Sequence, residues 1–96
     1  MLILPIKKKW FDMILSGEKK EEYREIKPYY NSRLPWYFEY SQSVERQVIF
    51  INGYSRNSPK IKCKCVLLIC YGKPEWGAEE GKEYYILKII EVINNE

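Results

Sequence analysis

Residues 60–71 read Lys60-Ile61-Lys62-Cys63-Lys64-Cys65-Val66-Leu67-Leu68-Ile69-Cys70-Tyr71, a long run with the composition of a β-strand. Successive side chains of a strand point to opposite faces, so the three lysines share one face and Ile61, Cys63 and Cys65 share the other. From Val66 to Cys70 the run is apolar without a break. Such a run predicts a bend into a region that is covered on both faces. We therefore expect one long strand here and a mainly β fold around it.

Four other segments also have the composition of strands. They are Leu2–Leu4, Lys20–Ile26, Gln47–Ile51 and Glu83–Ile93, the last apolar on both faces from Tyr84 to Ile90. Residues 52–59 and 72–82 are rich in turn-forming types and are expected to be loops. Five strands with one clear helix favour a small closed or partly closed barrel over an open sheet with exposed edges. The expected fold class is α+β, mainly β.

The clear helix is expected from about Lys7 to Ser16. Its apolar residues recur at positions i, i+4, i+7 and i+8, which places them on one face. They are Ile6, Trp10, Met13 and Ile14. Gly17 follows where a left-handed C-cap is needed. Residues 28–45 predict one short second helix and an irregular, aromatic-rich connection, and long connections of this kind are often functional.

Size and charge limit the possible functions. The chain has 96 residues, 46% hydrophobic and 30% charged, which fits one globular domain over residues 1–96. No repeat or linker is visible. The net charge of +3 is small for a nucleic-acid-binding domain, so any such site must be local. Histidine is absent, which removes the usual neutral-pH acid or base and the commonest metal ligand.

The three cysteines, Cys63, Cys65 and Cys70, are odd in number and clustered, which is not a disulfide framework. No fourth ligand accompanies them, so no metal and no cofactor is expected. We expect three buried, reduced thiols and a reducing compartment, the cytoplasm. The charges at Lys7–Lys9 follow the apolar start of the chain, the reverse of a signal peptide. No apolar run approaches the ~20 residues of a membrane span.

The segment from Gly17 to Arg24 carries the clearest functional pattern, Gly17-x-Lys19-x-x-Glu22-x-Arg24. The pattern runs into the expected strand Lys20–Ile26, which has charges on both faces, so one charged row is expected to face a cleft. Arg24, held by Glu22, would form a rigid fork for a phosphate or a base edge. Glu22 could itself accept from an exocyclic amine. The alternative is a surface cluster of ion pairs, each worth about 0–1 kcal/mol.

This pattern resembles the signature of the ASCH domain family. Ile6-Lys7-x-x-Trp10, Asn52-Gly53-Tyr54 and Pro74-Glu75-Trp76-Gly77 are also similar to short bacterial and phage members. The resemblance implies a PUA-like β-barrel with a cleft beside the motif, and RNA or a nucleotide as the partner. The nucleic-acid-binding residues it indicates are Lys7, Lys19, Glu22, Arg24, Asn52, Tyr54 and Trp76.

Two alternatives to binding remain open. Some members of the family are hydrolases that act on RNA or on modified cytidine, such as N4-acetylcytidine. In that case Lys19 would be nucleophile or base, and Glu22 would orient it or relay a proton. The members that deacetylate a nucleoside have Thr where this chain has Glu22, and a carboxylate there stabilises the charged ammonium of Lys19. A protein-interaction module is the third possibility, and it predicts that the cleft charges are dispensable.

Other basic and aromatic residues have two interpretations each. Lys7–Lys9 lie at a helix N-terminus, where the macrodipole disfavours cations, so a nearby anion or simple solvation would explain them. The lysine row at Lys60, Lys62 and Lys64 predicts a solvated face rather than a track for a phosphate backbone. Four aromatic residues could stack on unpaired bases or fill the core. They are Trp36, Tyr37, Tyr40 and Trp76.

Overall fold

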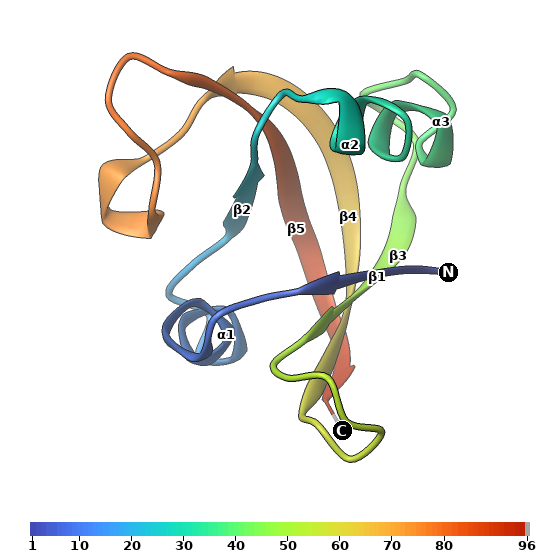
Figure 1. Cartoon of the computed structure of the whole chain (residues 1–96), viewed down its shortest axis with the longest axis vertical. Coiled ribbons are helices and arrows are strands. Elements are labelled where there is room, and N and C mark those ends of the chain that lie inside the picture. The colour runs from blue at the N-terminus through green and yellow to red at the C-terminus, as the bar shows by residue number, and fades with distance from the viewer. Residues whose placement is uncertain (96) are drawn as a thin grey trace.

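The structure is a computed structural model that describes residues 1–95. It contains a five-stranded mixed sheet that curls into a half-barrel, with short helices at its rim (Figure 1). The elements in chain order are β1 (Leu2–Pro5), α1 (Lys8–Leu15), β2 (Glu21–Arg24), α2 (Pro28–Asn31), α3 (Leu34–Tyr37), β3 (Arg46–Ile51), β4 (Lys60–Tyr71), the 3₁₀ helix η1 (Pro74–Trp76) and β5 (Glu83–Asn95). The expected α+β, mainly β class is confirmed, whereas a closed barrel is not.

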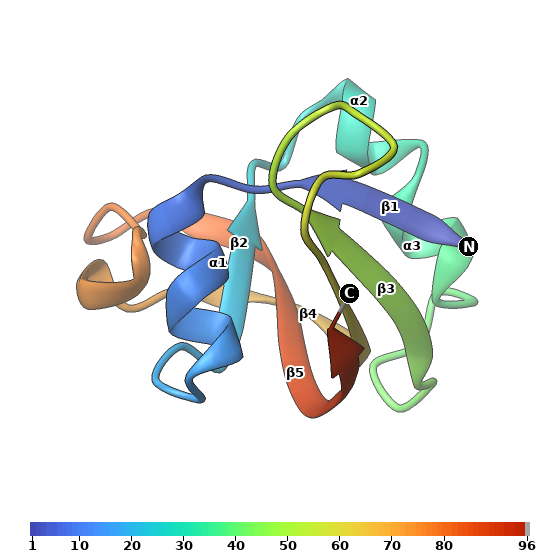
Figure 2. The same cartoon turned by 90° about the horizontal axis from the view of Figure 1, so that it is seen from below.

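The strand order β1-β3-β4-β5-β2 explains why the barrel stays open. β1 pairs in parallel with β3, and the other neighbours are antiparallel. β1 and β2 are therefore the two edges of the sheet, and α1 connects them (Figure 2). Within residues 1–95 no backbone ladder joins these two edges. The gap between them is called the seam below.

The burial pattern of β4 matches the sequence prediction in the first half of the strand and differs from it in the second half. Ile61, Cys63 and Cys65 are buried, as the alternation predicts. Ile69 and Cys70 are exposed, so the expectation of cover on both faces up to Cys70 is wrong. The reason is that β3 pairs with β4 only as far as Cys65, and the rest of β4 has a strand on one side only. The prediction that all three thiols are buried is therefore wrong for Cys70.

The helices follow local signals closely. α1 lies within one residue of the predicted span at each end, and Gly17 has the left-handed φ of +87° that its C-cap position requires. Residues 28–45 form two four-residue helices, α2 and α3, where the sequence predicted one. Pro28 and Pro35 each stand in the first turn of one of these helices. A proline inside a longer helix would break it, so the second proline separates α2 from α3.

The core lies inside the curled sheet, between its concave face, α1 and the α2–α3 connection. α1 contributes Phe11 and Ile14, and the connection contributes Leu34 and Phe38, which are completely buried. Tyr84–Leu87 of β5 are buried on both faces of the strand, as expected, whereas Ile90 at the end of the apolar run is exposed. The aromatic-rich connection therefore closes one end of the half-barrel as well as presenting aromatic side chains outside. None of the helices in residues 1–95 has both the length and the apolar character of a membrane span.

Candidate functional site

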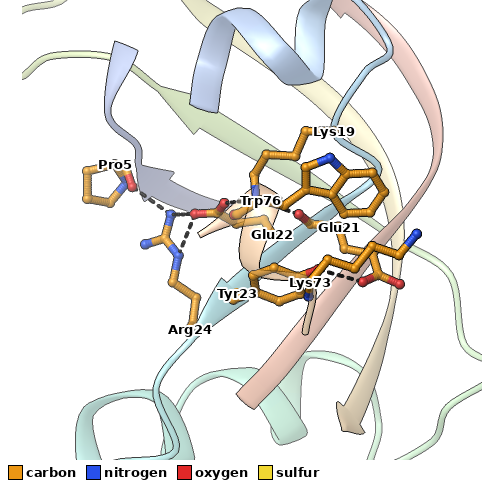
Figure 3. Close-up of polar contacts among 8 residues, drawn as sticks. All are labelled: Pro5, Lys19, Glu21, Glu22, Tyr23, Arg24, Lys73 and Trp76. Atoms are coloured by element: carbon orange, nitrogen blue, oxygen red, sulfur yellow. Dashed lines mark hydrogen bonds and ion pairs between the residues drawn. The ribbon is translucent and has the colours of Figure 1, made fainter. Parts of the chain in front are cut away.

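The charged pattern at residues 19–24 lies in the seam between the two edge strands. Glu22 and Arg24 are buried on the inner face of β2, while Lys20, expected on the same face, is exposed. Lys19, which precedes the strand, is also buried. The three buried side chains form one polar group, here called the seam cluster (Figure 3). Because it is buried, the alternative of a surface cluster of ion pairs does not describe it.

Arg24 joins the two edges of the sheet. Its Nη2 donates to the carbonyl oxygen of Pro5 on β1 at 2.7 Å and to Glu22 Oε2 at 2.7 Å. Its Nε donates to the same carboxylate oxygen at 3.0 Å. Its Nη1 donates to the hydroxyl of Tyr30 at 3.1 Å. Side-chain bonds of Arg24 thus span the seam that the backbone leaves open.

Lys19 has a complete set of acceptors inside the protein. Its Nζ donates to the carbonyl oxygens of Glu21, at 2.6 Å, and Trp76, at 2.7 Å. It also lies 3.2 Å from Glu22 Oε1. The two carbonyls can only accept, so with the carboxylate they use all three hydrogens of an ammonium group. Burial lowers the pKa of Lys19 below its usual value, against the opposing effect of Glu22.

Aromatic rings surround the same ammonium group. Lys19 Nζ lies 5.0 Å from the centre of the Trp10 ring and 4.7 Å from that of Tyr23. These distances fit cation–π interactions, which favour the charged form. Lys19 is only 1% exposed. It is therefore a buried, fully bonded cation and does not project into a cleft, in contrast to the role that the sequence suggested.

Glu22 lies between the two cations and is the only carboxylate that pairs with either within residues 1–95. The seam cluster carries two positive charges and one negative charge, which leaves a net charge of +1 beneath the surface. In the described part of the chain every buried side-chain nitrogen and oxygen has a hydrogen-bond partner. The cluster is therefore compatible with folding and still makes the seam electropositive.

A groove lies over the seam cluster. One hollow of about 400 Å³ is bounded by α1, β2 and α2, and a second of about 390 Å³ is bounded by residues 52–54. Both are lined by Pro5, Ile6 and Lys7, so they adjoin across the junction of β1 and α1. The other lining residues are Trp10, Glu22, Tyr23, Arg24, Glu25, Lys27, Tyr30, Asn52, Gly53 and Tyr54. These two hollows together are called the groove.

Five of the seven residues predicted for the site line the groove. They are Lys7, Glu22, Arg24, Asn52 and Tyr54. The side-chain amide of Asn52 also donates to the carbonyl oxygen of Ile6 at 2.9 Å, which fixes this side of the groove. Lys19 and Trp76 do not line the groove, and Trp76 acts through its backbone carbonyl.

Tyr30, Lys27 and Trp10 are among the groove residues that were not predicted from the sequence. Tyr30 accepts from Arg24, Lys27 Nζ lies 5.6 Å from the centre of the Tyr30 ring, and Trp10 faces the seam cluster. The sequence signal for the first two was the start of a helix at Pro28, which places Lys27 and Tyr30 close to the end of β2. Trp10 lies in α1, and the helical periodicity predicted it on the core-facing side.

The other basic and aromatic candidates lie outside the groove. Lys64 is within ion-pair distance of Glu45 and Glu91, and Lys60 donates to backbone carbonyls of the adjacent loop. These contacts fit the solvated face that the lysine row predicted. Trp36 and Tyr40 are strongly exposed rather than part of the core.

No group of Cys, Asp and Glu side chains in residues 1–95 is arranged to hold a metal ion. Comparison of the chain with family models, with curated proteins and with solved structures found no match.

Proposed function

We propose that the protein binds RNA or a nucleotide in the groove, and that it is a PUA-like domain of the ASCH type whose barrel is open at the seam. The observation that carries the proposal is Arg24, a buried guanidinium on the floor of the groove, with Lys7 and Lys27 exposed on its rim. Cations in this arrangement suit a phosphate group, which Arg binds through its planar fork.

The donors of Arg24 support this role. A guanidinium has five N–H donors. The four hydrogen bonds to Glu22, Pro5 and Tyr30 use four of them. One N–H of Nη1 thus has no acceptor among residues 1–95, and Arg24 lines the groove. A phosphate oxygen or a base carbonyl in the groove could accept from it.

The carboxylates of the groove do not cancel its positive charge. Glu22 is already shared between Lys19 and Arg24. Glu25 accepts a hydrogen bond from Lys82 at 3.1 Å, and this bond lowers the pKa of Glu25. The charge of Glu25 is therefore already paired with a lysine outside the groove. An anion in the groove therefore meets Lys7, Lys27 and Arg24 without an unpaired carboxylate facing it.

Aromatic side chains beside these cations extend the proposal from phosphate to a nucleotide. Tyr30 and Trp10 line one hollow, and Tyr54, 94% exposed, lines the other. Unpaired bases stack on such rings, and this contact is tolerant of sequence. The free thiols are consistent with a reducing compartment, and we place the function in the cytoplasm.

One observation favours the alternative of a hydrolase. Burial lowers the pKa of Lys19, as activation of a lysine base or nucleophile requires. The same burial keeps substrate away, because the nitrogen is surrounded by two carbonyls, a carboxylate and two rings. Binding without turnover of N4-acetylcytidine is the expected behaviour, and turnover that disappears in Lys19→Met while the fold persists would support the hydrolase.

The direct test is the affinity for a fluorescent hexauridylate measured by anisotropy. The double variant Lys7→Ala/Lys27→Ala should bind about tenfold or more weakly at low salt, because two phosphate contacts are lost. Lys20→Ala/Lys88→Ala is the matched control, since it removes the same charge from exposed positions outside the groove. Equal affinities of the two double variants, or no binding by the wild type, would refute the proposal.

A further inference from the structure

A third hollow, of about 660 Å³, lies at the other end of β1 from the groove. Met1 and Leu2 line one side of it, Arg33 and Trp36 another, and Glu39 and Arg46 also contribute. Figure 2 shows the start of β1 beside α3, and both figures show its end leading to α1. The indole of Trp36 is 69% exposed here, an unusual position for the largest aromatic side chain. We call this the Trp36 hollow.

Arg33 is held in place in this hollow. Its guanidinium carbon lies 3.7 Å from the centre of the Tyr29 ring, and Nη1 donates to the Tyr29 carbonyl at 2.6 Å and to Ser32 Oγ at 3.1 Å. No carboxylate within residues 1–95 pairs with Arg33, whereas Arg46 pairs with Glu39. The hollow therefore presents one ordered cation without a counter-charge, next to an exposed indole.

The Trp36 hollow and the groove lie near one another, along the same strand and the same short helix. α2 separates them: Tyr30 lines the groove, and Ser32 and Arg33, just beyond the same helix, line the hollow. β1 connects them along its length, since Leu2 lines the hollow and Pro5 lines the groove. Three residues of strand cover about 10 Å, at ~3.3 Å per residue. That distance is about three stacked nucleotides, at ~3.4 Å each.

We propose that Trp36 stacks on an unpaired base, and Arg33 binds a phosphate, of the same RNA strand that occupies the groove. The inference rests on the proposed function and adds to it a second subsite and a preference for a single-stranded oligonucleotide over a mononucleotide. The positive sign of the hollow matches that of the groove, as one polyanionic ligand requires. Base–aromatic stacking gives binding energy independent of sequence.

The test compares two ligands, uridine 5′-monophosphate and hexauridylate, by calorimetry with folded protein. Wild type should bind the hexamer more tightly than the mononucleotide. Trp36→Ala should weaken hexamer binding about tenfold or more, as loss of one stacked base does, and leave mononucleotide binding within about twofold because Trp36 does not line the groove. Tyr71→Ala, at an exposed aromatic residue that lines neither site, is the control and should change neither affinity.

The two proposals fail in different ways. If wild type binds neither ligand at low salt, the proposed function is wrong and this inference falls with it. If both ligands bind, Lys7→Ala/Lys27→Ala weakens both, and Trp36→Ala changes neither, the groove stands and the second subsite is refuted. In that last case we would assign the exposed indole of Trp36 to contact with a protein partner.

Discussion

The carboxylate of Glu22 holds two buried cations, and each of its oxygens serves one of them. Burying an ion costs several kcal/mol, which an ion pair offsets only when the remaining donors and acceptors are also satisfied. The carbonyls of Glu21 and Trp76, the carbonyl of Pro5 and the Tyr30 hydroxyl provide those partners. The groups of the seam cluster therefore depend on one another, and the loss of any one leaves the others buried without a partner.

Substitution of Lys19 tests this dependence. Lys19→Met keeps much of the side-chain volume but leaves two carbonyls and Glu22 Oε1 without a donor. The expected loss in the free energy of unfolding is about 3–5 kcal/mol, the usual cost of removing one partner of a buried pair. Urea denaturation measures it, and Lys20→Met, one residue along and exposed, should change stability by less than ~0.5 kcal/mol. Equal effects of the two substitutions would contradict the burial of Lys19.

The thiols give a second prediction at single residues. Burial raises the pKa of Cys63 to about 12 and raises that of Cys65 as well, whereas Cys70 is exposed. Because the thiolate is the reactive form, Cys70 alone should react with a chromogenic disulfide reagent at about pH 8, and all three should react in denaturant. A Cys70→Ser variant that still reacts when folded would contradict the assignment.

The raised pKa of Cys63 also predicts how the stability of the fold changes with pH. The pKa of Cys63 in the folded state lies above 9.0, the ordinary value of an unperturbed thiol. The folded state therefore retains the proton that the unfolded state loses. The stability that the protonated thiol contributes is complete below about pH 9 and is lost as the pH rises towards 12. The free energies of unfolding of wild type and Cys63→Ala, measured against pH, should converge between about pH 9 and 12. A constant difference between them would contradict the raised pKa of Cys63.

Strand alternation indicated that Glu22 and Arg24 share a face, and the resemblance to the ASCH pattern added Lys19 to them. Neither could show that Lys19 turns inwards. That orientation depends on the carbonyl of Trp76, which is distant in sequence, and backbone acceptors leave no signal in residue types. Pro5 was missed for the same reason.

At the scale of elements, Tyr23 ties β2 to the loop that follows β4. Its hydroxyl donates to Glu21 Oε1 at 2.7 Å and accepts from the backbone N–H of Lys73 at 2.9 Å (Figure 3). Gly72 packs against the same ring, where an added Cβ would lie 2.7 Å from it. This loop leads to η1, whose Trp76 carbonyl accepts from Lys19. Tyr23 therefore positions an acceptor of the seam cluster.

Tyr23→Phe removes only the hydroxyl and tests this link. The amide of Lys73 should exchange with deuterium faster, because it loses its acceptor, and stability should fall by about 1–3 kcal/mol. Tyr29→Phe is the control, since the Tyr29 side chain is exposed. Unchanged exchange at Lys73 would show that Tyr23 does not hold the loop.

Elements with strong local patterns were predictable. The alternation in β4 and the apolar face and glycine cap of α1 are properties of the segments themselves. The division of residues 28–45 into α2 and α3 was also encoded, in Pro35, but a high aromatic content drew the interpretation towards one irregular connection. The exposure of Ile69 and Cys70 was not encoded locally, because it depends on where β3 stops pairing.

For the whole molecule, the open seam is the property on which the proposed function rests. The parallel pairing of β1 with β3 puts β1 at one edge and leaves β2 at the other. This arrangement brings Pro5–Lys7 beside Arg24 and Lys27 to form the groove. Sequence patterns predicted the strands and the class, but the partners of each strand are set by long-range packing and could not be read from the segments.

The charge of the groove predicts how binding responds to salt. Contacts from Lys7, Lys27 and Arg24 to the backbone of a single strand should each contribute about −0.7 to the slope of log affinity against log salt. Lys7→Ala/Lys27→Ala should flatten the slope between about 50 and about 200 mM salt, and Lys20→Ala/Lys88→Ala should not. A slope near zero for the wild type would exclude phosphate recognition in the groove.

The most direct test of the central claim is a titration of ¹⁵N-labelled protein with uridine 5′-monophosphate at low salt, followed by amide chemical shifts. We predict saturable shifts at Ile6, Lys7, the Arg24–Lys27 segment and Asn52–Tyr54, which surround the groove. Lys7→Ala/Lys27→Ala should need about tenfold more nucleotide to reach the same shifts. Absence of shifts at millimolar nucleotide, or shifts confined to residues outside the groove, would contradict the claim that this protein binds a nucleotide at its open seam.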